Sequence, residues 1–136
     1  MSQENVEALK RALAAFARRD MDAVLAEYDP EIEWYPGRAG LLAGETMVYR
    51  GHGGIRQLAD DLDKAFSVAE IEFDDHRIID DSRVIAIGRV RTRGRSSDIE
   101  TVTPVAYLVE GRNGKPTRVR AFLNVAEALE AVDTPD

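Results

Sequence analysis

The chain has 136 residues, a formal net charge of −7 and no cysteine. This length suits one domain with a sizeable core, so we expect a single domain over residues 1–136. The acidic charge argues against nucleic acid and membrane surfaces as partners, because both attract basic proteins. Without cysteine there is no disulfide, and no apolar run approaches the ~20 residues that cross a bilayer. We see no secretory signal and expect a cytoplasmic protein.

The first half of the chain carries the signals of three helices. Apolar residues recur at helical spacing between Val6 and Phe16, which predicts a first amphipathic helix. Asp20 is placed to cap a second helix. That helix ends at Asp29-Pro30, because the residue before a proline is pushed out of the helical region. Gly51 and two further glycines precede a third helix, whose apolar face runs from Ile55 to Phe66.

The second half of the chain has the period of strands. A short strand is predicted earlier, where Ile32 and Trp34 alternate with glutamates. From residue 68 onward, strands are predicted at about 68–79, 83–93, 99–110 and 117–124, followed by a short closing helix at 126–132. The turn residues between the strands favour sequential antiparallel pairing. Helices first and a meandering sheet afterwards are typical of the α+β class.

Two of the predicted strands are apolar on both faces, at residues 84–87 and 102–108. An antiparallel strand that is covered on one side only should alternate cleanly between apolar and polar residues. Helices can cover one face, so we expect the second face to be buried in a homodimer. An irregular core in a monomer is the alternative.

This order of elements resembles the nuclear transport factor 2-like superfamily, and most of all its SnoaL-like and ketosteroid-isomerase-like branches. The segments that carry the resemblance are 11–22, 29–34 and 49–56, and it spans essentially the whole chain. The resemblance implies a cone-shaped α+β fold, in which three N-terminal helices pack on a strongly curved antiparallel sheet around one apolar pocket. The candidates that it implies for this pocket are Phe16, Tyr28, Trp34, Tyr49, His52, Leu58, Leu62, Ile87, Arg89, Ala106 and Ala121.

The catalytic groups of the known branches are missing from this sequence. Steroid isomerases use a carboxylate base, a tyrosine and a protonated carboxylic acid. The resemblance places the base position at Trp34, or at Tyr35 with a small gap, the tyrosine and acid positions at Ala12 and Ala106, and a second tyrosine position at Ala59. SnoaL-like cyclases carry an aspartate on the last strand, but residues 117–124 contain no carboxylate. Neither mechanism is available in its known form.

Two polar residues remain open to a functional and a structural interpretation. The strand that contains Arg89 lacks the aspartates that limonene-epoxide-hydrolase-like relatives bridge with an arginine. In the isomerase-like register Arg89 points into the pocket, where it would need a carboxylate partner. Alternatively, Arg89 and its neighbours form a solvated stripe on the outer face beside Glu100. His52 is either a capping residue or an acid–base group at the mouth of the cone.

The sequence therefore predicts a protein that binds a small, largely apolar organic ligand in the cone pocket. The absence of the family carboxylates favours binding, since proton transfer near neutral pH needs a positioned titratable group. The alternative is an isomerase or polyketide-cyclase-like enzyme with a non-standard acid–base pair, such as His52 with Glu33 or a tyrosine. Neither a cofactor nor a metal ion is expected, because no nucleotide loop or ligand spacing is visible.

Overall fold

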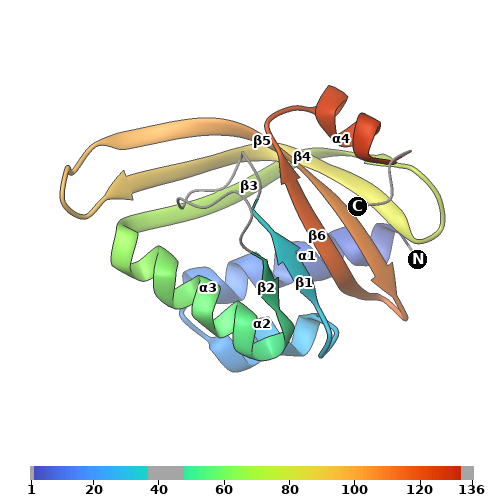
Figure 1. The fold of residues 1–136 in the computed structure, drawn as a ribbon, viewed down its shortest axis with the longest axis horizontal. Helices are drawn as coiled ribbons and strands as arrows, with labels where there is room; N and C mark the ends of the chain where they lie inside the picture. The colour runs from blue at the N-terminus through green and yellow to red at the C-terminus, as the bar shows by residue number, and fades with distance from the viewer. Residues whose placement is uncertain (1, 37–47, 133–136) are drawn as a thin grey trace.

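The computed structural model describes residues 2–36 and 48–132, which form four helices and one six-stranded sheet (Figure 1). In chain order the elements are α1 (Ser2–Ala17), α2 (Met21–Glu27), β1 (Glu33–Tyr35), β2 (Tyr49–Arg50), α3 (Gly51–Ala65), β3 (Phe66–Ile78), β4 (Arg83–Gly94), β5 (Glu100–Arg112), β6 (Lys115–Phe122) and α4 (Val125–Val132). The predicted α+β class is confirmed. No helix within the described ranges is long and apolar enough to span a membrane.

The sheet has the strand order β2-β1-β6-β5-β4-β3. Its four long strands, β3 to β6, pair sequentially and antiparallel, as the turn residues between them predict. β1 joins β6 in parallel, with Trp34 opposite Val119, so the sheet is mixed at this end. That long-range pair has no signal in the sequence. It brings the short aromatic strand next to the last strand of the chain.

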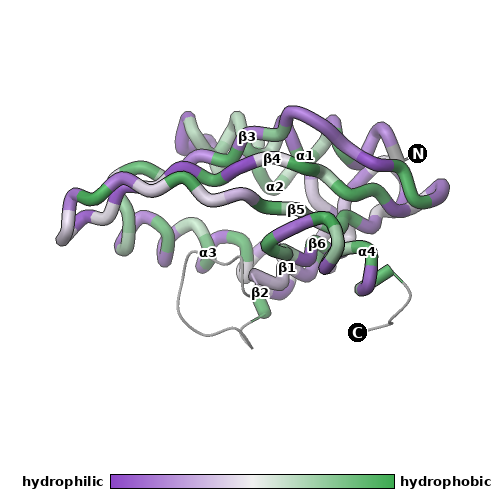
Figure 2. The backbone as a smooth tube through the Cα atoms, turned by 90° about the horizontal axis from the view of Figure 1, so that it is seen from above, coloured by the Kyte–Doolittle hydropathy of each residue, from purple (hydrophilic) through white to green (hydrophobic). Residues whose placement is uncertain are grey.

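The helices cover the two faces of the sheet unequally. α1 packs across β3 to β6, and α3 packs against β1, β2 and β3. Figure 1 shows α1 and α3 below the long strands, with α4 on the other side of the sheet. Along α3 the chain alternates between hydrophobic and hydrophilic segments (Figure 2), as expected of a helix with one buried face. The three N-terminal helices therefore enclose the concave face of a strongly curved sheet.

Two apolar clusters lie on opposite faces of the same strands. Val84 and Ala86 belong to the concave-face cluster, together with residues of α1 and α2. Ile85 and Leu108 point the other way and pack against Ala128 of α4. Because successive residues of a strand face opposite sides, residues 84–87 and 105–108 are covered within one chain, while Val102 stays 57% exposed. The homodimer predicted from these segments stays a prediction.

Local sequence signals set the entry and exit of the helices around the concave face. The Asp20 carboxylate caps α2 by accepting a hydrogen bond from the Ala23 N–H at 3.2 Å, as predicted. Gly51 adopts a φ of 70°, which glycine tolerates best, and its N–H donates to the Ile32 carbonyl at 2.6 Å. This bond ties the start of α3 to the chain just before β1.

Candidate ligand-binding cavity

A cavity of about 300 Å³ lies between the helices and the concave face of the sheet. Its walls come from α1, α2, α3, β1, β3 and the residue that follows α2. The aliphatic part of the lining consists mainly of Leu13, Val24, Ile55, Leu58, Leu62 and Ile71. Such a volume is at the lower end of the range for small-molecule sites, which are usually concave and mostly apolar.

Aromatic rings form a second part of the lining. Phe16, Tyr28, Trp34 and Phe73 all border the cavity, and they come from four separate segments. The Tyr28 and Trp34 rings meet edge to face, with centroids 6.3 Å apart and planes at 64°. Behind them the Tyr107 ring lies 5.5 Å from Trp34 and 5.6 Å from Phe73. These contacts fix the orientation of the aromatic wall.

Tyr28 brings a polar atom to this apolar space. It is the residue after α2, and its side chain is 3% exposed. The residue lines the cavity, and none of the described residues forms a hydrogen bond with its hydroxyl. Burial raises the pKa of Tyr28 above its ordinary value. The group is therefore a neutral donor and acceptor near neutral pH.

Charged residues border the cavity only at its edge, within the described ranges. Glu70 and Glu72 lie on β3, and their carboxylates bind Arg91 at 2.6 Å and Arg89 at 3.0 Å. Lys10 is exposed on α1. No described residue places a carboxylate or an imidazole inside the cavity, and the described part of the chain holds no cluster of three metal-ligating side chains. This arrangement can hold and orient a molecule, but it offers no positioned base.

Five of the predicted pocket residues line the cavity: Phe16, Tyr28, Trp34, Leu58 and Leu62. Ala12 and Ala59, which stand at the two tyrosine positions of the isomerases, line it as well. The sequence reasoning did not assign Leu13, Met21, Val24 and Ile55 to the pocket, and it missed the inward residues of β3, among them Ile71 and Phe73. The sequence does carry a signal for them, since Ile71 and Phe73 alternate with acidic residues, which is the pattern of a strand with one buried face.

Three further candidates lie close to the cavity but not on its wall. Tyr49 and Ala121 are buried in the concave-face cluster. The Tyr49 hydroxyl donates to Asp61 at 2.8 Å, and burial together with this bond raises the pKa of Tyr49 to about 12. The His52 Nε2 atom lies 3.2 Å from the Tyr28 carbonyl oxygen, so the imidazole links α3 to the end of α2. An acid–base role for His52 inside the cavity has no geometric support.

The expectation that Arg89 points into the pocket is wrong. Val84, Ala86 and Val90 of β4 face the concave side, so Arg89 faces outward. Its guanidinium is 49% exposed and binds Glu72 at 3.0 Å and Asp74 at 2.8 Å. The alternative, a solvated arginine stripe, is confirmed for the described residues.

The prediction that Ile87 and Ala106 line the pocket is wrong for the same reason. Both belong to the cluster under α4 on the outer face, while the neighbouring Tyr107 faces the concave side. The register taken from the isomerase resemblance is thus displaced by one residue on both β4 and β5. In a strand, a displacement of one residue exchanges the two faces.

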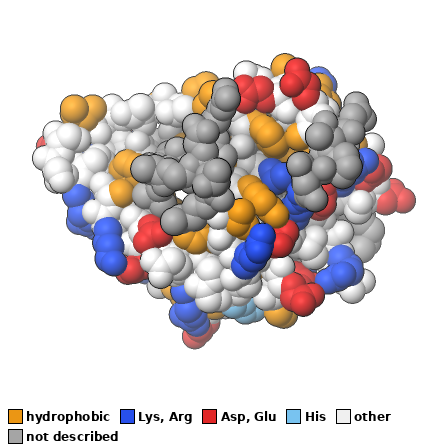
Figure 3. All heavy atoms as spheres, viewed as in Figure 1, with side chains coloured by type: hydrophobic (Ala, Val, Ile, Leu, Met, Phe, Trp, Pro, Cys, Tyr) orange, Lys and Arg blue, Asp and Glu red, His pale blue; other side chains and the backbone are white. Residues whose placement is uncertain are grey.

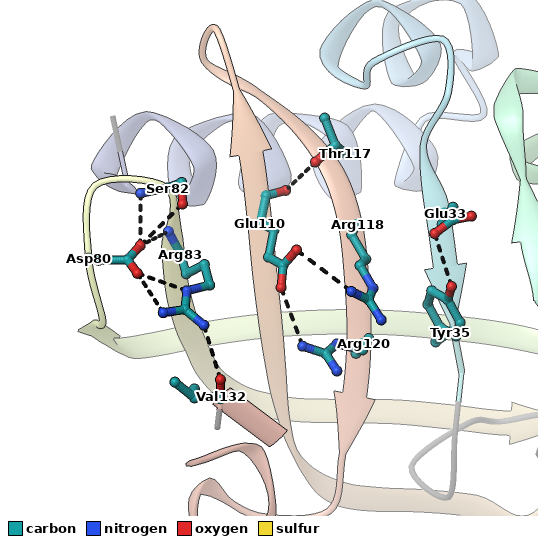
Figure 4. Close-up of polar contacts among 10 residues, drawn as sticks. All are labelled: Glu33, Tyr35, Asp80, Ser82, Arg83, Glu110, Thr117, Arg118, Arg120 and Val132. Atoms are coloured by element: carbon teal, nitrogen blue, oxygen red, sulfur yellow. Dashed lines mark hydrogen bonds and ion pairs between the residues drawn. The ribbon is translucent and has the colours of Figure 1, made fainter. Parts of the chain in front are cut away.

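The outer face of β1, β5 and β6 carries a polar cluster (Figure 4). The Tyr35 hydroxyl donates to Glu33 at 2.9 Å, and the Arg118 guanidinium lies over the Tyr35 ring at 5.2 Å. The Arg120 guanidinium contacts Glu110 at 3.3 Å. Glu33 is therefore committed to the outer face and is not available to the cavity. On the molecular face drawn in Figure 3, acidic and basic side chains are intermixed.

A curved open sheet that packs three helices around one apolar cavity defines the cone-shaped, nuclear transport factor 2-like class of protein. The model of the SnoaL-like domain family matches residues 9–123, so the chain belongs to this family. No curated protein matches the sequence significantly.

Solved structures extend this likeness over nearly the whole chain. TerC, co-crystallised with polyporic acid, is 21% identical with a TM-score of 0.75, covering 96% of this chain and 99% of its own. A candidate polyketide cyclase from Xanthomonas campestris pv. campestris is 18% identical with a TM-score of 0.73, covering 96% and 98%. RV0760c from Mycobacterium tuberculosis, in complex with estradiol-17beta-hemisuccinate, is 10% identical with a TM-score of 0.73, covering 90% and 95%. Identities this low show a common fold.

Proposed function

We propose that this protein binds a small, largely apolar organic molecule in the cavity, without using the carboxylates that catalyse reactions elsewhere in the superfamily. The observation that carries the proposal is the character of the site. A cavity of about 300 Å³ has aliphatic and aromatic walls, and no described residue places a carboxylate or imidazole inside it. Moving apolar ligand surface from water into such a space is favourable by roughly 25 cal/mol per Å². The walls therefore supply affinity without supplying a base.

Two proteins of the same fold support small-molecule binding as the role. TerC was co-crystallised with polyporic acid, and RV0760c is in complex with estradiol-17beta-hemisuccinate. By analogy of fold, we place the ligand of this chain between the helices and the concave face. The identity of the ligand does not transfer at these levels of sequence identity.

An isomerase or cyclase is the alternative role, and the likeness to a candidate polyketide cyclase favours it. The Tyr28 hydroxyl can polarise a carbonyl, but abstraction of a proton also needs a base within hydrogen-bond reach. Glu70 and Glu72 border the cavity, but their carboxylates are bound to Arg91 and Arg89 on the outer face of the sheet. Binding therefore accounts for the described site with fewer groups than catalysis.

We also propose that two copies associate through the part of the outer face that α4 leaves open. Val102 of β5 lies there and is 57% exposed, so it is free to pack against a second copy. Sedimentation velocity at micromolar concentration should give the mass of a dimer. A monomer under these conditions would contradict the association and leave the ligand proposal intact.

The binding proposal can be tested through Trp34, the single tryptophan of the chain, which lines the cavity. Titration with fluorene, a neutral three-ring hydrocarbon, should change its emission in a saturable way with one molecule bound per chain. Native mass spectrometry of protein purified from its own host should show a retained ligand of a few hundred daltons or less, since the cavity holds about 300 Å³.

Two variants, in each of which an alanine is replaced by phenylalanine, make this test specific to the cavity. Ala59→Phe fills space on the α3 wall and should weaken fluorene binding at least about tenfold, because ligand and side chain compete for one volume. Ala26→Phe adds the same group at an exposed position of α2 and should leave binding unchanged. Unsaturable binding to the wild type, or equal binding to Ala59→Phe, would reject the proposed function.

A further inference from the structure

The Tyr28 hydroxyl is a polar group that a purely apolar cavity does not explain. Buried tyrosine hydroxyls normally have a hydrogen-bond partner, because an unpaired buried donor costs stability. Two of the four tyrosines follow this rule: the Tyr35 hydroxyl donates to Glu33 at 2.9 Å and the Tyr49 hydroxyl donates to Asp61 at 2.8 Å. Tyr107 is 4% exposed and, like Tyr28, forms no side-chain hydrogen bond with a described residue, but it does not line the cavity. Tyr28 is 3% exposed, and no described residue pairs with its hydroxyl. Because Tyr28 lines the cavity, a molecule bound there can supply the missing partner.

The position of this hydroxyl is fixed by three contacts that do not involve it. The Tyr28 N–H donates to the Leu25 carbonyl at 3.2 Å, and its carbonyl oxygen lies 3.2 Å from the Nε2 atom of His52. Its ring stands edge to face against Trp34, with centroids 6.3 Å apart. A donor that is held in place before the ligand arrives loses little freedom on binding, so its hydrogen bond favours affinity and orientation.

The lining also restricts the charge and shape of the ligand. No described residue offers a charged group inside the cavity, and a charge buried without a partner is costly, which selects neutral molecules. Four aromatic rings border the space, which favours flat, ring-containing molecules. The protonated hydroxyl of Tyr28 favours an acceptor, because a carbonyl oxygen accepts a hydrogen bond and cannot donate one.

We propose that Tyr28 is the specificity-determining residue of the cavity, and that it donates a hydrogen bond to a carbonyl oxygen on a neutral, ring-containing ligand. This inference rests on the proposed function, because it names the chemistry that the same cavity selects. Burial raises the pKa of Tyr28, so the hydroxyl keeps its proton throughout the neutral and mildly alkaline range. The preference for a carbonyl should therefore not change between pH 6 and pH 9.

The test uses two probes that share one skeleton, fluorene and 9-fluorenone. Fluorene has a methylene group at the position where 9-fluorenone has a carbonyl group. Tyr28→Phe removes the hydroxyl and keeps the ring against Trp34. We expect this variant to bind 9-fluorenone about three- to tenfold more weakly than the wild type, the typical worth of one hydrogen bond. Its affinity for fluorene should stay within about twofold, since that probe has no acceptor for the lost donor. Calorimetric titration measures the affinities for both probes without relying on fluorescence.

Tyr49→Phe is the matched control, because its hydroxyl pairs with Asp61 and Tyr49 is not on the cavity wall. This variant should bind both probes like the wild type and melt at a lower temperature. Tyr28→Phe should melt at the wild-type temperature or above it, since it removes an unpaired polar group. Unchanged affinity of Tyr28→Phe for 9-fluorenone, or an equal loss for both probes, would overturn the role of Tyr28 alone. If neither probe binds the wild type, the proposed function itself fails.

Discussion

The two faces of the sheet come from the same strands, yet their polar side chains differ in whether they have partners within the protein. On the outer face, Arg89 and Arg91 each contact two carboxylates, and the cluster around Glu110 is likewise paired. On the concave face the lining is apolar, and the Tyr28 hydroxyl has no partner among the described residues. A paired polar group stabilises the fold as it stands. The Tyr28 hydroxyl, on a residue that lines the cavity, is left available to a ligand.

This contrast predicts that neighbouring residues of β1 differ sharply in their contribution to stability. Trp34 is 6% exposed on the concave face and contacts the rings of Tyr28 and Tyr107. Trp34→Ala should lower the free energy of unfolding by about 3–5 kcal/mol. Tyr35→Ala removes a half-buried ring on the outer face and should cost less than half as much. Urea unfolding followed by circular dichroism measures both, and equal losses would contradict the asymmetry of the two faces.

The apolar half of the outer face can be tested through α4. Ala128 is fully buried beneath this helix, so Ala128→Asp places a carboxylate in the cluster with Ile85 and Leu108. We expect a loss of about 2–4 kcal/mol, less than for a charge in a central core, because a terminal helix can detach. Ala126→Asp lies exposed in the first turn of the same helix, where an acidic residue is tolerated. Thermal unfolding should separate the two, and equal melting temperatures would show that α4 does not cover the sheet.

The sequence was sufficient for the elements but not for the faces. Helical spacing, the Asp20 cap and the turn residues are local signals, and each was confirmed. Residues 84–87 are apolar throughout, so their pattern does not reveal which residues face the helices. The adjacent alternation of arginines with Val90 and Thr92 does indicate a solvated stripe. The register taken from a distant resemblance pointed the other way, and it placed Arg89 on the wrong face.

The residues that line the cavity were also predicted only in part. Phe16 on α1 and Leu58 and Leu62 on α3 were found because a helix with one apolar stripe has one orientation that buries it. The inward side of β3 was missed, although Phe73 and its neighbours alternate with acidic residues. The parallel pairing of β1 with β6 and the packing of α4 on the outer face join segments that are distant in sequence. No local pattern encodes such contacts, so the second cover of the sheet was assigned to a partner copy.

Acid should affect the polar turn beside the sheet, whereas no described residue places a carboxylate inside the cavity. Arg83 binds Asp80 at 2.6 Å in the turn between β3 and β4 (Figure 4), and the Ser82 N–H donates to it at 3.0 Å. These bonds lower the pKa of Asp80 to about 2. A depressed pKa stabilises the fold above the unfolded pKa of about 4, and this contribution is lost as pH falls towards 2.

Asp80→Asn should therefore be less stable than the wild type at pH 5 by a modest amount, because the ion pair is partly exposed. The difference between the two proteins should shrink as pH falls from 4 to 2, and thermal unfolding across this range measures it. A constant difference would show that the Asp80 carboxylate gains nothing from Arg83 and the turn. Probe binding in the cavity should be equal for both proteins wherever they are folded.

The smallest effect on stability is expected for Arg89, and it separates the two faces most directly. Arg89→Met keeps the length of the side chain but removes contacts with Glu72 and Asp74 on the outer face. Exposed ion pairs contribute between about 0 and 1 kcal/mol each, so the unfolding free energy should change little, and less still at high salt. Its affinity for 9-fluorenone should equal that of the wild type, in contrast to Tyr28→Phe on the concave face. A loss of affinity in Arg89→Met would mean that the guanidinium reaches the ligand, and the division between a paired outer face and a receptive concave face would have to be abandoned.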